Sequence, residues 1–129
     1  AALQRSPEVD FIFTSSDQMY PQIRAVLEPL GKWKRIGEPG HVILGGVDGD
    51  TLAARWMKEG YVDATGVQDL FYEADAVTAE LLNAIEAGAK TPDKWLEDPG
   101  FALTQANMAE HAMAMWGYEL LVEQDSVAR

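Results

Sequence analysis

The chain has 129 residues, of which 47% are hydrophobic and 24% are charged, so its composition is that of one globular domain or part of one rather than of a disordered segment. Ten lysines and arginines against 21 aspartates and glutamates give a net charge of −11, which repels phosphate backbones and anionic membrane surfaces, and we expect no nucleic-acid partner. The absence of cysteine excludes disulfides, thiolate nucleophiles and cysteine-ligated metals. The two histidines, His41 and His111, are far apart in sequence, and we expect neither to be a metal ligand.

Two strands are predicted in the first third of the chain, at Phe11 to Thr14 and at Val42 to Val47, because both are short apolar runs. Apolar residues recur at helical spacing between them, and the glycine and prolines of this stretch limit the helix to about Gln18 to Glu28. Residues 32–41 are basic and then rich in glycine and proline, as is typical of a surface loop.

The alternation of strand and helix continues beyond the second strand. A short helix is marked by Leu52 to Met57 and ends at Gly60, and a third strand is predicted at Tyr61 to Val67. An apolar stripe then indicates a helix of about 17 residues that Gly88 stops. The stripe consists of Phe71, Ala74, Val77, Leu81, Leu82 and Ile85.

The C-terminal part begins with a linker at residues 90–100 and a short extended segment from Phe101 to Thr104. Asn107, followed three residues later by Glu110, resembles a capping box and predicts the start of a last helix. The apolar side of that helix is predicted to be Met108, Ala112, Met115 and Leu120.

This alternation predicts an α/β fold with a parallel sheet flanked by helices, because parallel neighbours need a crossover and the crossover is usually helical. Ligands of such sheets bind outside the carboxyl ends of the strands. Three polar stretches follow the predicted strands there, namely Thr14 to Asp17, Asp48 to Asp50, and Gln68 to Asp69. The sequence therefore predicts a polar site at this edge of the sheet.

Patterns of known catalytic sites are weak in this sequence. The stretch from Gly45 to Gly49 lacks the Lys-Ser/Thr of a phosphate-binding loop and the spacing of a dinucleotide fingerprint, and Ser15 and Ser16 lack a nucleophile-elbow pattern. Asp17 and Asp48 could pair for acid/base work or hold Mg²⁺, which keeps a metal-dependent α/β enzyme open as an alternative. Our prediction is a protein that is not an enzyme and that needs no metal or cofactor.

A non-catalytic site for a polar ligand fits the same residue types better. Ionised carboxylates accept hydrogen bonds from adjacent sugar hydroxyls, and Gln68 can both donate and accept. Each residue also has a plainer interpretation: Asp17 as a helix N-cap, Asp48 as a turn residue before glycine, and Gln68 as a solvated strand end.

Four segments together resemble the C-terminal lobe of type I periplasmic sugar-binding proteins, in the ribose-binding branch. That family shows a proline-aspartate lead-in, an Asn-Asp-x-Met turn, a strand ending in Gly-x-Asp-Gly, and a Gly-x-x-x-Ala-Thr-x-x-Gln segment. The matching positions here are Pro7 to Asp10, Ser16-Asp17-Gln18-Met19, Gly46-Val47-Asp48-Gly49, and Gly60 with Ala64-Thr65 and Gln68. They occur in the same order at compatible spacing, and the likeness spans about residues 5 to 110.

The resemblance implies a substrate-binding component of an ABC-type sugar importer, located in the periplasm, with a signal peptide expected upstream of the chain given. Two α/β lobes would close on a monosaccharide or related polyol and deliver it to a membrane permease. It carries ligand-binding roles onto Asp17 and Gln68, and a less certain role onto Asp48. Ser16, a further candidate ligand-binding residue, stands where the family usually has Asn. Its shorter side chain alters the direct contact with the sugar that the Asn would make, and so the identity of the sugar.

The lactose-repressor family shares this fold, so the effector-binding domain of a transcription regulator is the alternative within it. Its third-strand region usually reads as a proline followed by Thr-Thr-Val and a Gln-Pro pair. This sequence has Lys58-Glu59-Gly60 and Ala64-Thr65 instead. The departure favours the transporter interpretation.

The resemblance also implies that residues 1–129 are a C-terminal fragment, because complete members of the family are considerably longer. Residues 70–98 would then be a hinge crossing and a helix that packs on a missing N-terminal lobe. The side chains of Phe71, Val77, Leu81 and Ile85 would have no partner within the chain, and we expect self-association of the fragment.

Overall fold

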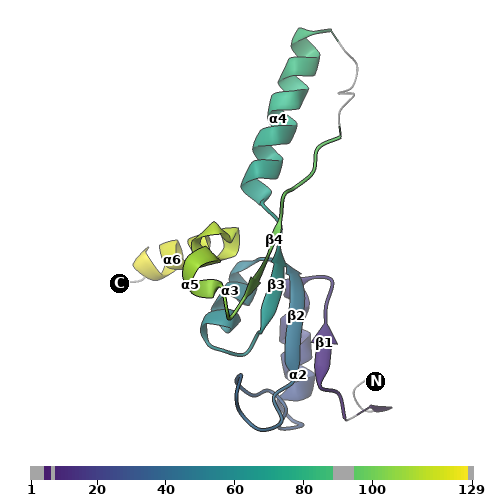
Figure 1. The fold of residues 1–129 in the computed structure, drawn as a ribbon, viewed down its shortest axis with the longest axis vertical. Helices are drawn as coiled ribbons and strands as arrows, with labels where there is room; N and C mark the ends of the chain where they lie inside the picture. Colours follow the sequence, from purple (N-terminus) through teal and green to yellow (C-terminus); the bar gives the residue numbers. More distant parts are fainter. Residues whose placement is uncertain (1–4, 7, 89–94, 128–129) are drawn as a thin grey trace.

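The computed structural model describes residues 5–6, 8–88 and 95–127 (Figure 1). The sequence-predicted lead-in at Pro7 and most of the first half of the predicted linker lie outside the described residues. The elements in chain order are β1 (Phe11–Phe13), the 3-10 helix η1 (Asp17–Met19), α2 (Tyr20–Leu27), β2 (Ile43–Asp48), α3 (Thr51–Lys58), β3 (Ala64–Val67), α4 (Leu70–Glu86), β4 (Phe101–Thr104), α5 (Met108–His111), the 3-10 helix η2 (Ala112–Ala114) and α6 (Trp116–Val127).

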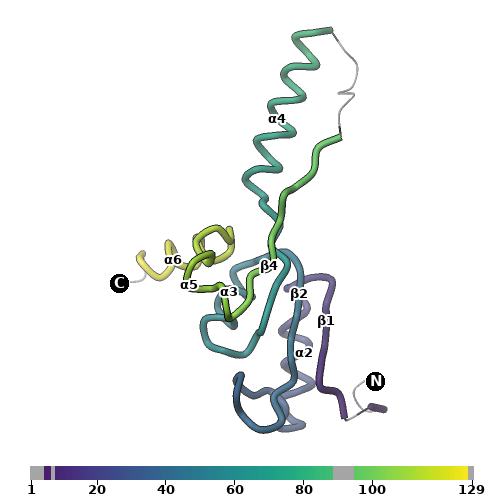
Figure 2. The backbone as a smooth tube through the Cα atoms, viewed as in Figure 1, coloured from purple at the N-terminus to yellow at the C-terminus, as the bar shows by residue number. Residues whose placement is uncertain are grey.

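The four strands form one sheet in the order β1-β2-β3-β4. The first three strands are parallel, with Phe11 opposite Ile43 and Gly45 opposite Ala64. The fourth strand is antiparallel to β3, because the chain leaves the sheet along α4 and comes back from the same end (Figure 2). The α/β class predicted from the alternation, a parallel sheet flanked by helices, is confirmed, with β4 as the antiparallel exception.

Two predicted boundaries shift for local reasons. The third strand begins at Ala64 rather than at Tyr61, because the amides of Tyr61 and Val62 still donate to the Trp56 carbonyl at 2.8 and 3.3 Å and complete the turn after α3. The first helix is divided into η1 and α2, with Pro21 in the first turn of α2, where a missing amide costs little.

The predicted start of a helix after Asn107 is confirmed, because Asn107 is the N-cap residue of α5, but the predicted capping box is wrong. The side-chain oxygen of Asn107 accepts from the amide and the hydroxyl of Thr104, at 2.7 and 3.1 Å, and so closes the turn after β4 instead of capping α5. The helix is then interrupted, because Met115 has an extended backbone between η2 and α6. This interruption changes the helical phase, and Leu121 rather than Leu120 takes the fully buried position of α6.

The core lies on one face of the sheet. Leu44 on β2, Thr65 on β3 and Leu103 on β4 lie on the face of the sheet that is covered by α2 and α3, and all three are buried. These two helices lie behind the sheet in Figure 1. The rings of Tyr20 on α2 and Trp56 on α3 meet edge to face at 6.1 Å between centroids. On the opposite face, Phe11, Phe13 and Ile43 remain exposed.

Helix α4 projects from the body of the molecule (Figure 1). Its first turn is capped by Asp69, whose carboxylate accepts from the Tyr72 amide at 2.9 Å. The apolar side chains of the predicted stripe are exposed along it, with Val77 at 60% and Ile85 at 63% of their full accessible surface. Large exposed apolar patches of this kind mark contact surfaces or cause association.

We expect the 129-residue chain to self-associate in solution, because water contacts this helix along an apolar face. Replacing Val77 and Ile85 with serine should lower the average mass measured by size-exclusion chromatography with light scattering. Asn83→Ser, at another exposed position of α4, serves as the control and should leave the mass unchanged. A well-folded monomer at micromolar concentration before any substitution would contradict the expectation.

Candidate functional site

Three of the sequence-predicted residues meet at the carboxyl edge of the sheet, and we call Ser16, Asp48 and Gln68 the polar edge. The hydroxyl of Ser16 donates to Oδ2 of Asp48 at 2.7 Å, although the two residues are 32 positions apart. The backbone amide of Gln68 donates to the Asp48 carbonyl at 3.3 Å. Ser16 and Asp48 are half-buried and Gln68 is exposed, so all three residues reach the surface of the molecule.

The backbone of Asp48 is unusual. Its φ of 118° lies in the region that residues with a side chain avoid, at a cost on the order of 1–3 kcal/mol. The Asp48 carbonyl accepts a second hydrogen bond from the indole nitrogen of Trp116 at 2.8 Å. The turn that ends β2 is therefore held by both β3 and α6.

Asp17 lies inside the protein rather than on the polar edge. Its side chain is 0% exposed, and Oδ2 accepts from the Gly49 amide at 2.8 Å and from the Thr65 hydroxyl at 2.8 Å. The Asp50 amide lies at 3.4 Å from the same oxygen. A ligand contact by Asp17 stays a prediction, but in this structure protein groups enclose the carboxylate that would make it.

The alternative role of Asp17 as the helix cap belongs to its neighbour. Ser16 is the N-cap of η1, and its hydroxyl oxygen accepts from the Gln18 amide at 3.4 Å. The same hydroxyl donates a hydrogen bond to Oδ2 of Asp48. Ser16 thus combines the capping role and the surface role that the sequence suggested for Asp17.

The buried carboxylate of Asp17 is electrostatically costly. Burial raises the pKa of Asp17 from 3.8 to about 6, against the lowering effect of the hydrogen bonds from Thr65 and Gly49. Burial, and the neighbouring Asp17 carboxylate, also raise the pKa of Tyr20. Oδ1 of Asp17 and the Tyr20 hydroxyl lie together against Gly46, and neither makes a well-oriented hydrogen bond among the described residues.

We expect Asp17→Asn to be at least as stable as the unaltered chain above pH 7. The amide keeps an oxygen for Gly49 and Thr65 and gains an N–H for Tyr20, while the ionised carboxylate costs roughly 3 kcal/mol at that pH. Because folding raises the pKa of Asp17, this cost is complete above pH 6 and disappears as the pH falls toward 4.

Urea denaturation at intervals between pH 4.5 and 7.5 measures this difference. The stability of the unaltered chain relative to Asp17→Asn should rise as the pH falls through 6. Asp10→Asn, which changes an exposed carboxylate, is the control, and its stability should follow the same pH dependence as that of the unaltered chain. A large loss of stability in Asp17→Asn at pH 7, with no change across the pH range, would contradict the assignment.

Gly46 is required where β2 crosses the pair of Asp17 and Tyr20. A Cβ at this position would overlap Oδ1 of Asp17 and the Tyr20 hydroxyl, whereas a Cβ at Gly45, on the other face, would make an ordinary 3.7 Å contact with Phe13. We expect Gly46→Ala to lower the free energy of unfolding by about 1–3 kcal/mol and Gly45→Ala to change it much less, measured by urea denaturation. Equal effects of the two substitutions would contradict the close approach of Gly46 to the side chains of Asp17 and Tyr20.

Thr65 and Trp116 contribute to this region, although the sequence did not predict either as a site residue. Thr65 was part of a matching segment, and its place two positions before Val67 puts it on the inner face of β3, so strand periodicity could have found it. Trp116 lies 68 residues after Asp48 in sequence, and no spacing or pattern connects the two.

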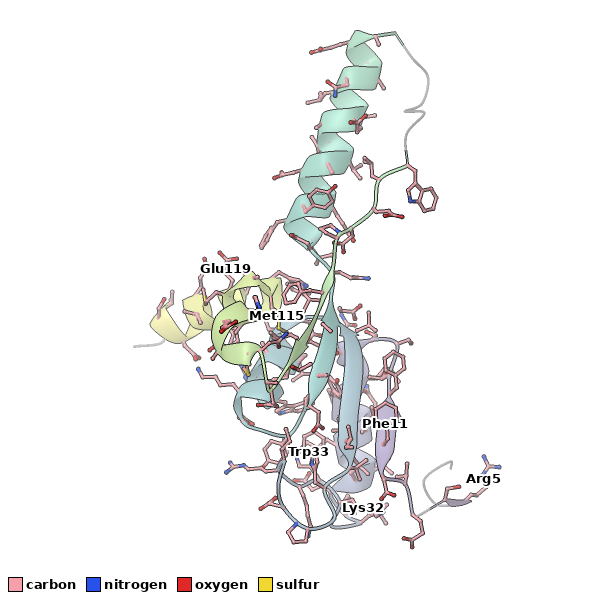
Figure 3. The ribbon with its side chains drawn as sticks, in the orientation of Figure 1. Arg5, Phe11, Lys32, Trp33, Met115 and Glu119 are labelled. Atoms are coloured by element: carbon pink, nitrogen blue, oxygen red, sulfur yellow. The ribbon has the colours of Figure 1, made fainter. Side chains whose placement is uncertain are left out.

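The electrostatic surroundings of the polar edge are acidic. The carboxylate of Asp98 accepts from the Asp69 amide at 3.0 Å, which adds two further aspartates next to Gln68. The described lysines and arginines lie before β1, in the last turns of α2 and α3, or in the loop before β2, and so toward the opposite edge, where Figure 3 labels Arg5 and Lys32. They are Arg5, Arg24, Lys32, Lys34, Arg35, Arg55 and Lys58.

Within residues 5–6, 8–88 and 95–127, no three histidine, aspartate or glutamate side chains come together in a way that could hold a metal ion. Asp17 and Asp48, the carboxylate pair considered for Mg²⁺, have separate partners: Asp17 binds backbone amides and Thr65, and Asp48 binds Ser16. No helix in the described part of the chain is both long and apolar enough to cross a membrane.

Comparison with known proteins gives a likeness of fold. The chain matches none of the established protein-family models and none of the curated proteins at a significant level. It is similar in structure to a protein from Mycobacterium smegmatis known from its crystal structure, with a TM-score of 0.59 and 18% sequence identity. The match covers 98% of this chain and 41% of that protein, so the chain corresponds to less than half of the larger one. This likeness establishes the α/β fold.

Proposed function

We propose that the chain is part of the substrate-binding component of an ABC-type sugar importer, which binds a monosaccharide or related polyol without catalysis. The observation that carries the proposal is the meeting of Ser16, Asp48 and Gln68 at the carboxyl edge of the sheet. Ligands of open α/β sheets bind at this edge. The resemblance of the surrounding segments to ribose-binding-like proteins supports the same conclusion.

The chemistry of the polar edge suits hydroxyl groups. Oδ2 of Asp48 accepts from Ser16, and its second oxygen can accept from a ligand hydroxyl in a charge-assisted hydrogen bond. The side-chain amide of Gln68, an exposed residue, can donate to one hydroxyl oxygen and accept from another hydroxyl. A polyhydroxylated ligand offers donors and acceptors on neighbouring carbons, and these three side chains supply the complementary groups.

The charge of the edge favours a neutral ligand. Asp48, Asp69 and Asp98 lie at this end of the sheet, and the described lysines and arginines lie at the other. A carboxylate on the ligand would meet like charges there. A neutral sugar or polyol should therefore bind in preference to a sugar acid.

Helix α4 has a role in this proposal as well. A cleft between two lobes needs a second wall, and the exposed apolar face of α4, which begins two residues after Gln68, would pack on the other lobe. The proposed setting is the periplasm, and the proposed partner is the membrane permease that receives the sugar. The 41% coverage of the larger protein of known structure is compatible with such a second lobe.

Calorimetric titration of the natural full-length protein with a panel of neutral monosaccharides and polyols tests the proposal. We expect saturable binding of one of them in the micromolar range, and no binding of the corresponding uronic or aldonic acid. Asp48→Asn should weaken binding roughly 10- to 100-fold, because it removes a charge-assisted hydrogen bond. Gln68→Ala should weaken binding by a smaller factor of roughly 2 to 10.

Asp10→Asn is the matched control, since it removes an exposed carboxylate far from the polar edge, and it should leave the affinity unchanged. Asp17→Ala is less informative, because it removes a buried group that holds Gly49 and Thr65 and would disturb the fold as well. Failure of every neutral sugar and polyol to bind would refute the proposed function.

A further inference from the structure

We propose that Trp116, the first residue of α6, is a positioning residue of the polar edge, which holds the turn after β2 so that Asp48 and Gln68 face a ligand in one fixed geometry. The inference rests on the proposed function. It adds α6, an element beyond the last strand, to the parts of the chain that set the ligand affinity.

The contact of Trp116 is with a single peptide group. The indole N–H donates to the Asp48 carbonyl at 2.8 Å, and the Gln68 amide donates to the same oxygen at 3.3 Å. The N–H of this peptide group belongs to Gly49 and donates to the buried Asp17 carboxylate at 2.8 Å. The peptide between Asp48 and Gly49 is thus held on its oxygen side and on its nitrogen side at once.

This peptide needs to be held, because the residue before it has an unfavourable conformation. Asp48 has a φ of 118°, and a non-glycine residue keeps such a value only where its surroundings enforce it. If the φ of Asp48 relaxed, its side chain and its carbonyl would turn together about the N–Cα bond, so Ser16 and the Gln68 backbone amide would both lose their acceptors. Two of the three ligand-facing residues therefore depend on one carbonyl.

The start of α6 is itself fixed in place. The amide of Gly117 donates to the Gly49 carbonyl at 3.0 Å, and a Cβ on Gly117 would overlap the backbone of Asp50, so α6 approaches the turn as closely as backbone allows. Met115 and Leu121 anchor the chain on both sides of Trp116 with 0% and 2% of their surfaces exposed. The indole donor is consequently held in place rather than free to follow the turn.

Trp116→Phe tests the role, because it keeps an aromatic ring and removes the N–H donor. Three quantities are measured on the natural full-length protein: the affinity for the sugar or polyol found in the panel, the hydrogen-exchange rate of the Gly49 amide, and the chemical shift of the Gln68 backbone amide. We expect the affinity to fall roughly tenfold and the exchange of Gly49 to accelerate by a similar factor. The amide shift of Gln68 should also change, because its acceptor moves.

Leu121→Val is the matched control, since it loosens the packing of α6 without touching Asp48. It should lower the melting temperature at least as much as Trp116→Phe and leave both the affinity and the Gly49 exchange close to their original values. If Trp116→Phe behaves like this control, Trp116 supports the fold only, and the inference is wrong.

The exchange measurement needs no ligand, so it separates the inference from the proposed function. If no sugar binds but Gly49 exchanges faster in Trp116→Phe than in the control, the proposed function fails while the hold on the peptide stands. If a sugar binds equally well to Trp116→Phe and Gly49 exchange is unchanged, the proposed function stands and the inference fails.

Discussion

The peptide group between Asp48 and Gly49 is the constraint on which the candidate site depends. Its nitrogen is bound by the buried carboxylate of Asp17, and its oxygen accepts from Trp116 and Gln68. These partners come from the segment after β1, from α6 and from the end of β3, so one peptide joins three separate parts of the chain. Without these bonds, the positive φ of Asp48 would relax, and the end of β2 would have no defined direction.

The polar residues at this end of the sheet divide into a buried layer and a surface layer. Asp17 and Thr65 form the buried layer, where their mutual hydrogen bond at 2.8 Å connects η1, which follows the first strand, with the third strand. Ser16, Asp48 and Gln68 form the surface layer. The buried layer carries an electrostatic cost, and it offsets that cost by fixing the backbone from which the surface layer projects.

The sequence was sufficient for the fold class and for placing Ser16, Asp48 and Gln68 at one end of the sheet, because both depend on local patterns. Strand and helix alternation predicts the sheet, and polar residues at strand ends predict its ligand edge. The sequence did not distinguish the roles of Ser16 and Asp17, since adjacent residues in a turn point in directions that only the surrounding packing decides. Trp116 was beyond reach for another reason: a contact across 68 residues leaves no periodic signal. The capping box at Asn107 failed because its side chain had a nearer competitor in the backbone of Thr104.

Helix α4 and the polar edge share a mechanical connection. The helix has 17 residues, which corresponds to a length of about 25 Å, and it starts two residues after Gln68. At its base, the carboxylate of Asp98 on the returning segment accepts a hydrogen bond from the Asp69 amide, which joins the outgoing and returning segments just beyond the paired strands β3 and β4. A rod fixed at its base acts as a lever: a rotation of about 10° at Asp69 moves the far end of α4 by about 4 Å. Conversely, a force applied by a binding partner at the far end of α4 produces its largest bending moment at the base of the helix, beside Gln68.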